Sequence, residues 1–342
     1  MKFIKTLGRT RWLSSFIFLI ALFLIVGTIN SSFLTPQSII SVLNNSVVYI
    51  VLAVGIAFVI LCGEIDVSIG ATMGLAAAIS GTMAQHSQSF GMMIVCALLL
   101  GLGVGLFNGI GVAVLGIPSL IFTLGTCGIV RGLVYLYTKG HTVENFAGPF
   151  TAFNNFNIFS GITWYFAMVF VAVIAVFLLL TYTKRGKYFI AVGDNINGAI
   201  LVGLPAKQTK VAAYIISGCF AALSGILFAS KYGQVNIVAG TGYEMSAIAA
   251  CVIGGISLTG GLGDVIGAMI GAVIMSSISK MLVFLGLSSD FNNTITGVML
   301  ITIVVVDALA QRRSVENSRR KRLAARTSLG ASPQPVPEEA AK

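Results

Sequence analysis

Long apolar runs, separated by short polar stretches, recur along the chain from Leu13 to Leu309. A run of about 20 apolar residues is long enough to cross the hydrocarbon core of a bilayer as a helix. Apolar residues make up 56% of the chain, charged residues make up only 9%, and the mean hydropathy is +0.96. These values lie outside the range of soluble domains. The runs therefore predict a polytopic membrane protein with one membrane domain over residues 13–309.

Ten apolar windows can be placed along the chain. They cover residues 13–33, 46–62, 71–85, 91–115, 119–138, 163–182, 210–230, 245–258, 264–286 and 291–309. The third and eighth windows are too short to cross about 30 Å as straight helices at about 1.5 Å per residue. We expect broken or re-entrant elements there. The predicted fold class is an all-α polytopic membrane protein of about ten transmembrane helices, some of them short or broken.

Basic residues cluster at three places, all on the same side of a ten-span chain. The clusters are Lys2, Lys5, Arg9 and Arg11 before the first window, Lys184, Arg185, Lys187, Lys207 and Lys210 after the sixth, and seven residues within 312–326. Because positive residues accumulate on the cytoplasmic side, both termini are predicted to be cytoplasmic, the first of them formed by residues 1–12. The net charge of +10 then reflects topology and not nucleic-acid binding. The tail 310–342, basic and then rich in Pro, Ala and Glu, is predicted to be disordered.

The cysteines and histidines do not indicate a metal or a catalytic centre. No C-x-x-C pair occurs, and His86 and His141 fall in predicted loops. Five cysteines lie inside the predicted spans as small packing residues: Cys62, Cys96, Cys127, Cys219 and Cys251. We therefore expect no metal and no cofactor in this chain, and the pattern disfavours an intramembrane enzyme.

Glycine is abundant, with 39 residues, and several glycines are spaced to bring helices together. The stretch 101–109, GLGVGLFNG, repeats small residues at helical spacing, which lets backbones approach closely in lipid. Two further stretches resemble each other: GEIDVSIG at 63–70 and GGISLTGG at 254–261 share Gly, Ile, a hydroxyl residue and Gly at equal spacing. This match is compatible with an internal duplication, as transporters often have, and equally with chance agreement between glycine-rich octamers.

Glu64 and Asp66 lie two residues apart between segments that carry no other charge. Carboxylates at membrane depth face the protein interior or water. Backbone groups freed where a helix breaks must be satisfied by protein or in a wet cavity. We therefore expect this stretch to be an unwound or terminal piece of span in the protein interior, at membrane depth if the next segment crosses the bilayer and near the inner surface if it is re-entrant. Asp66 is expected to cap the helix that starts near Ile69.

Four separated motifs carry a resemblance to a known family. They are 63–75 GEIDVSIGATMGL, 118–132 PSLIFTLGTCGIVRG, 191–203 AVGDNINGAILVG and 239–268 AGTGYEMSAIAACVIGGISLTGGLGDVIGA. In this order they resemble the permease subunits of bacterial ABC importers of the ribose type, including relatives that import autoinducer-2. The resemblance covers roughly residues 13–309. Glu64 stands where the family more often has Gly, and Val67 stands where it has Leu.

The resemblance implies a permease of the bacterial inner membrane that passes a monosaccharide, ribose or a related small sugar, from a periplasmic binding protein to the cytoplasm. It further implies pairing with a second permease copy or a sister permease around a central pathway. The sequence has no G-x-x-x-x-G-K-[ST] phosphate loop, so ATP hydrolysis is expected in separate ATPase subunits. The alternative is a secondary transporter driven by an ion gradient through Glu64, Asp66 and Arg131.

The polar connection after the sixth window is the expected contact with the ATPase. Residues 195–204 are predicted to form a short helix, entered from a Gly-Asp pair and closed by Gly203 and Pro205. By resemblance this is the coupling helix, and an ordinary amphipathic loop helix is the alternative. The residues assigned to coupling are Gly193, Asp194, Asn195, Ala199 and Gly203.

Five polar side chains are candidates for the substrate pathway: Asp66, Ser68, Asn108, Thr123 and Arg131. Arg131 lies in an otherwise uncharged window, where a cation needs a carboxylate or carbonyl partner or a wet interior. We expect Asp66 or Glu64 to be that partner. A purely structural ion pair would explain Arg131 as well as a contact with substrate.

Overall fold

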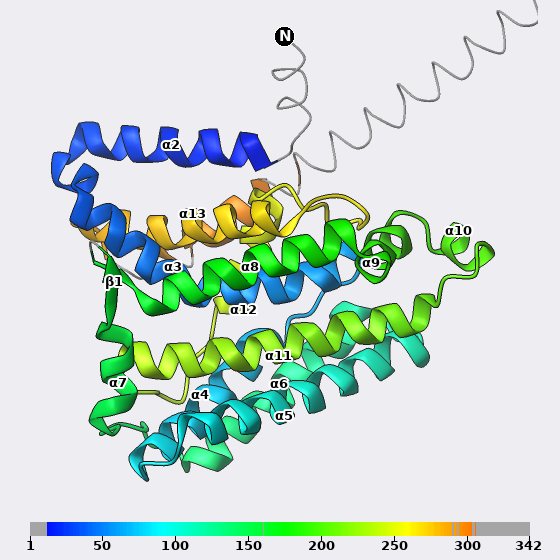
Figure 1. The fold of residues 1–342 in the computed structure, drawn as a ribbon, viewed down its shortest axis with the longest axis horizontal. Helices are drawn as coiled ribbons and strands as arrows, with labels where there is room; N and C mark the ends of the chain where they lie inside the picture. The colour runs from blue at the N-terminus through cyan, green and yellow to red at the C-terminus, as the bar shows by residue number, and fades with distance from the viewer. Residues whose placement is uncertain (1–11, 160, 289–290, 293, 303–304, 306–342) are drawn as a thin grey trace, which may run out of the picture. The chain divides into compact units, whose positions relative to one another are not determined.

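The computed structural model describes residues 12–159, 161–288, 291–292, 294–302 and 305. It divides into two compact units, Met1–Leu300 and Ile301–Lys342, and every element named below belongs to the first unit (Figure 1). The predicted cytoplasmic N-terminus lies outside the described residues except for Trp12, and the predicted tail 310–342 lies outside them entirely.

Among the described residues of the first unit, the regular elements are helices apart from one small antiparallel hairpin of β1 and β2, and Val143 and Val235 form an isolated bridge. The elements are α2 (Trp12–Ile29), η1 (Ser31–Leu34), α3 (Pro36–Leu61), α4 (Ile69–Gln85), α5 (Phe90–Gly109), η2 (Ile110–Val114, a π-helical turn), α6 (Ser119–Thr138), α7 (Gly148–Asn155), β1 (Asn157–Phe159), β2 (Ile162–Thr163), α8 (Trp164–Tyr182), α9 (Lys184–Asp194), α10 (Ile196–Leu201), α11 (Ala206–Tyr232), α12 (Tyr243–Ile253) and α13 (Val265–Phe284).

Seven helices among the described residues are long and apolar enough to cross a membrane: α2, α3, α5 with η2, α6, α8, α11 and α13. This confirms a polytopic, mostly helical membrane protein. Helices α4 and α12 have only 17 and 11 residues, so the third and eighth windows do hold short helices. The window 291–309 is described only in part. The count of ten spans therefore stays a prediction, as does the orientation of the termini.

Local capping explains where several helices begin. Helix α3 starts ten residues before its predicted window, because Thr35 caps it through the backbone N–H of Ser38 and Pro36 occupies its first turn. Asp264 caps α13 by accepting a hydrogen bond of 2.9 Å from the backbone N–H of Gly267. Polar residues at element boundaries thus shift the helix ends away from the limits set by hydropathy alone.

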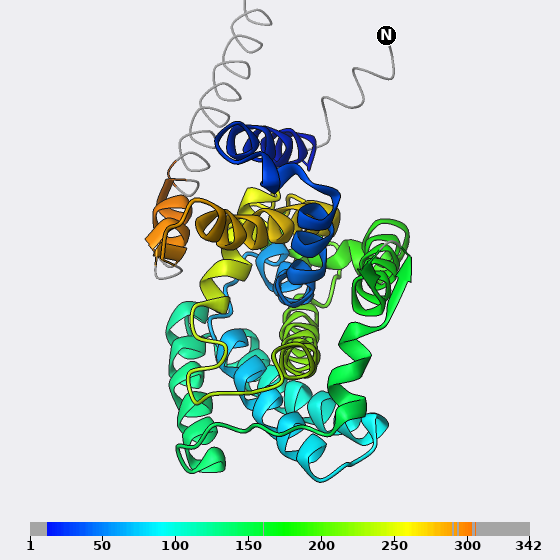
Figure 2. The same cartoon turned by 90° about the vertical axis from the view of Figure 1, so that its left-hand side faces the viewer.

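Helix α11 lies between α5 and α4 on one side and α3 on the other (Figures 1 and 2). Its packing against α5 depends on the predicted glycines. A Cβ added at Gly101 would lie 2.4 Å from the carbonyl oxygen of Gly218, and one at Gly105 would lie 2.4 Å from that of Tyr214. The two backbones are therefore in direct contact, as the small-residue spacing predicts.

Two helix breaks bring the two similar octamers together. Residues 62–68 separate α3 from α4, and residues 254–264 separate α12 from α13. The backbone N–H of Gly261 donates a hydrogen bond of 2.9 Å to the carbonyl oxygen of Leu61. Both octamers therefore occupy breaks that contact each other. Whether they arose by duplication stays a prediction.

Candidate functional site

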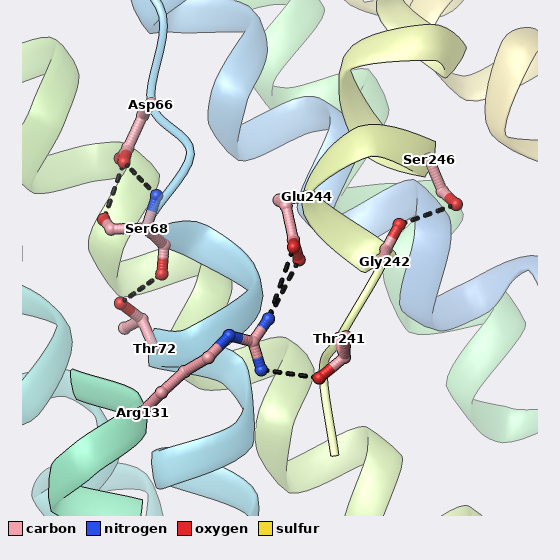
Figure 3. Close-up of polar contacts among 8 residues, drawn as sticks. All are labelled: Asp66, Ser68, Thr72, Arg131, Thr241, Gly242, Glu244 and Ser246. Atoms are coloured by element: carbon pink, nitrogen blue, oxygen red, sulfur yellow. Dashed lines mark hydrogen bonds and ion pairs between the residues drawn. The ribbon is translucent and has the colours of Figure 1, made fainter. Parts of the chain in front are cut away.

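Asp66 lies in the break between α3 and α4, and only 1% of its surface is exposed. Its Oδ1 accepts hydrogen bonds from the backbone N–H of Ser68 at 2.9 Å and from the Ser68 hydroxyl at 2.6 Å (Figure 3). The Ser217 hydroxyl of α11 donates to Oδ2 at 3.2 Å. The carboxyl group is thus buried in the protein interior, and donors from its own segment and from α11 satisfy both of its oxygens.

Asp66 accepts from the N–H of Ser68, the residue that precedes α4, and not from an N–H of the helix that starts at Ile69, so the contact lies one residue before the expected cap. The Ser68 side chain makes no capping bond to α4. Its hydroxyl instead donates to Asp66 and accepts a hydrogen bond of 2.8 Å from Nδ2 of Asn108 in α5. The predicted residues Asp66, Ser68 and Asn108 are therefore in one hydrogen-bonded cluster, which joins α4 to α5 and α11.

Side chains of α6 and α11 satisfy the backbone of the break. The N–H groups of Ile65 and Val67 donate to the Ser119 hydroxyl at 3.3 Å and the Thr123 hydroxyl at 3.2 Å. The Tyr214 hydroxyl donates to the carbonyl oxygen of Ile65 at 3.2 Å. Thr123 therefore holds the broken backbone. These contacts explain how an unwound segment is tolerated among apolar helices.

Arg131 does not pair with either predicted carboxylate. Its guanidinium lies 3.3 Å from Glu244 of α12 and donates a hydrogen bond of 2.7 Å to the Thr241 hydroxyl (Figure 3). The expected pairing with Asp66 or Glu64 is wrong, because the hydroxyl and amide donors described above occupy Asp66 and an ion pair with Lys210 engages Glu64. The Arg131–Glu244 ion pair is partly exposed, with 29% of the Arg131 side chain and 12% of the Glu244 side chain accessible.

Glu244 is the functional candidate that the sequence reasoning missed. It lies just before the window 245–258, where a lone carboxylate beside an apolar run was the available signal. A Cβ added at Gly70 would lie only 2.0 Å from Oε2 of Glu244. The glycine at this position therefore makes room for the carboxylate against α4.

The predicted coupling residues occupy the turn from α9 to α10. The short helix is confirmed at Ile196–Leu201, narrower than the predicted 195–204, and the preceding helix α9 was not predicted. Asn195 caps α10 by accepting a hydrogen bond of 2.9 Å from the N–H of Gly198, and Gly203 has a positive φ of 79° after the helix ends.

Two of these residues pack against other parts of the protein. Ala199 is buried with Val192 and Ala206, and a Cβ at Gly193 would meet the carbonyl oxygen of Leu61. Asp194 is exposed. The most exposed side chains at the end of α10 are apolar: Ile200, Leu201 and the following Val202 are 57%, 87% and 75% exposed. An apolar tip on a loop that is rich in lysine and arginine is an unusual surface.

The family described as branched-chain amino acid transport system / permease component matches residues 38–304. The chain belongs to this permease family. It is 36% identical over 323 residues to the autoinducer 2 import system permease protein LsrC of Salmonella typhi, covering 94% of this chain and 92% of the relative. The LsrC protein of Escherichia coli O9:H4 (strain HS) is also 36% identical, over 94% of both chains. No solved structure matches the chain.

Membership of the permease family confirms the resemblance seen in the four motifs. The protein is a permease of an ABC importer in the bacterial inner membrane, and its relatives are transport subunits and not enzymes. Among the described residues of the permease, no group of three or more His, Cys, Asp or Glu side chains could hold a metal ion.

Proposed function

We propose that this permease imports a small sugar or a sugar-like signal molecule, of the ribose or autoinducer-2 type, from the periplasm to the cytoplasm. The observation that carries the proposal is identity of 36% over 94% of the chain to permeases named for autoinducer 2 import. Nearly full-length similarity includes the membrane spans, so it bears on the transport pathway as well as on the fold. The gradient-driven alternative has no comparable support.

The partners follow from the class of transporter. The chain contains no phosphate-binding loop, so separate ATPase subunits hydrolyse ATP in this proposal. A periplasmic binding protein delivers the cargo, and a second permease copy or a sister permease completes the pathway. We also propose ten spans with both termini in the cytoplasm, which places the basic connection 183–205 on the ATPase side.

The contacts divide the five pathway candidates into two groups. Asp66, Ser68, Asn108 and Thr123 are buried and bonded to one another or to backbone, so we propose that they shape the wall of the pathway. Arg131 is partly exposed beside Glu244 and Thr241. A charged pair with an adjacent hydroxyl offers both donors and acceptors to a polyhydroxylated solute. We propose this trio as the contact with cargo.

The coupling surface is the exposed tip of α10. Leu201 is 87% exposed beside Ile200 and Val202, and burial of such a side chain against an ATPase groove would favour association by about 1.5–3 kcal/mol. In this proposal Gly193, Asn195, Ala199 and Gly203 set the position and shape of the turn, while Asp194 and the apolar tip face the partner.

The experiment that tests the function uses the permease purified with its co-encoded ATPase and binding protein, reconstituted in vesicles. Uptake of labelled ribose and of autoinducer-2 is measured with ATP inside, without ATP, and with an imposed proton or sodium gradient. We expect ATP-dependent uptake of one of the two solutes through the binding protein. Uptake driven by an ion gradient without ATP would contradict the proposal.

A further inference from the structure

The turn that begins at Gly193 contacts the break segment 61–66 from one side. A Cβ added at Gly193 would lie 1.8 Å from the carbonyl oxygen of Leu61 and 2.7 Å from the backbone nitrogen of Gly261. One turn earlier in α9, the Phe189 ring packs edge-on against Phe58 of α3, with ring centroids 5.1 Å apart. At Gly193 the end of α9 therefore meets the end of α3 backbone to backbone.

The start of α11, just after the same connection, contacts the break segment from the other side. Lys210 forms an ion pair with Glu64, and each side chain is only 16% exposed. One turn further, the Tyr214 hydroxyl donates to the carbonyl oxygen of Ile65 at 3.2 Å. Gly193 within the connection 183–205 and the first turns of α11 just after it thus contact the same short segment, 61–66.

The far end of this segment is Asp66, whose contacts lead into the membrane helices. Its carboxylate binds Ser68 at the start of α4 and Ser217 of α11, and through Ser68 it is joined to Asn108 of α5. A displacement of the segment would therefore change the environment of the polar cluster directly. Close-packed interiors transmit such displacements because they leave little free space.

We propose that Glu64, Lys210 and Gly193 are positioning residues through which movement of the connection 183–205 displaces segment 61–66 and the polar cluster around Asp66. This inference rests on the proposed coupling of α10 to an ATPase. It adds the route by which that coupling reaches the transport pathway. The route requires contacts with segment 61–66 from two sides, and the residues that make these contacts are well separated from the segment in sequence.

The test follows the accessibility of the segment itself. Ile65, which is half-buried, is replaced by Cys in a chain whose own five cysteines are removed. The complex with its co-encoded ATPase is placed in nanodiscs. The rate of maleimide labelling at position 65 is measured with and without ATP plus orthovanadate. We expect trapping to change the labelling rate in the parent complex, and no change with trapping overturns the proposal.

Variants of the ion pair then identify the route. Glu64→Lys and Lys210→Glu are each expected to abolish the effect of trapping on labelling at position 65 while the ATPase still co-purifies, and the double swap is expected to restore it. A merely structural pair would lower the yield of complex and leave the response of the assembled fraction intact. That outcome overturns the proposal. If the charge reversals fail to assemble, Tyr214→Phe serves as a milder variant, because it removes only one hydroxyl. We expect ATP plus orthovanadate to change the labelling rate at position 65 less in Tyr214→Phe than in the parent.

Gly193 is tested against a glycine of the same turn. Gly193→Ala is expected to abolish the labelling response at position 65, because its Cβ meets backbone. Gly198→Ala is the control, since the atoms nearest to its Cβ would belong to the Asn195 side chain, at 3.2 Å, and not to backbone, and the response should remain. A retained response in Gly193→Ala contradicts the route alone. Failure of the parent chain to bind the ATPase contradicts the proposed function instead.

Discussion

Substitutions of Asp66 distinguish two possible roles of its carboxylate: capping the start of α4 and carrying a proton. In Asp66→Asn the remaining oxygen can still accept from the N–H and hydroxyl of Ser68, and the new amide can donate to the Ser217 hydroxyl in place of accepting from it. Assembly and transport should therefore be largely kept. In Asp66→Leu the two serine hydroxyls can rotate to other acceptors, but the backbone N–H of Ser68 cannot.

The expected cost of Asp66→Leu is that of one buried donor without a partner, about 1–3 kcal/mol. Because about 1.4 kcal/mol corresponds to a tenfold change in an equilibrium constant, the ratio of folded to unfolded permease should fall by about fivefold to about 150-fold. The assay measures the yield of monodisperse complex after graded heating and, in parallel, uptake per assembled complex. An Asp66→Asn protein that assembles fully but transports nothing would refute this reasoning, because it would make the carboxylate a proton site.

Three further predictions concern the packing, the coupling surface and the topology. Gly105→Ala should destabilise the permease by about 1–3 kcal/mol in thermal unfolding, because its Cβ would meet the backbone of α11. Gly103→Ala is the control and should have the stability of the parent, because a Cβ at Gly103 has open space around it. Equal melting temperatures of the two variants would argue against the α5–α11 contact. Leu201→Asp should reduce co-purification of the ATPase while the permease alone keeps its yield, and undiminished capture would remove α10 as the docking element. A single Cys at position 196 should be labelled only from the cytoplasm and one at position 148 only from the periplasm, and labelling of both from one side would overturn the ten-span arrangement.

Sequence reasoning recovered the features that depend on neighbouring residues. Apolar windows located the long helices, because each span must satisfy its own backbone and expose apolar side chains to lipid. The spacing of Gly101 and Gly105 indicated a close helix contact, since small residues let two backbones approach in lipid, and the structure shows that the partner is α11. The placement of Asp66 just before Ile69 indicated that its side chain binds a backbone N–H near the start of α4, since a cap and the N–H it binds lie within one turn.

The sequence by itself thus determined a polytopic helical permease, its breaks and the cap at Asp66. Only the tertiary structure decided which charges meet. Arg131 pairs with Glu244, which is 113 positions away, and Glu64 pairs with Lys210, which is 146 positions away. It likewise showed that Gly193 contacts the chain's own α3. Sequence spacing specifies distances only within one helix or turn. Pairings between helices depend on how their faces pack, and in this permease the packing of α3, α4, α6, α11 and α12 brings those residues together.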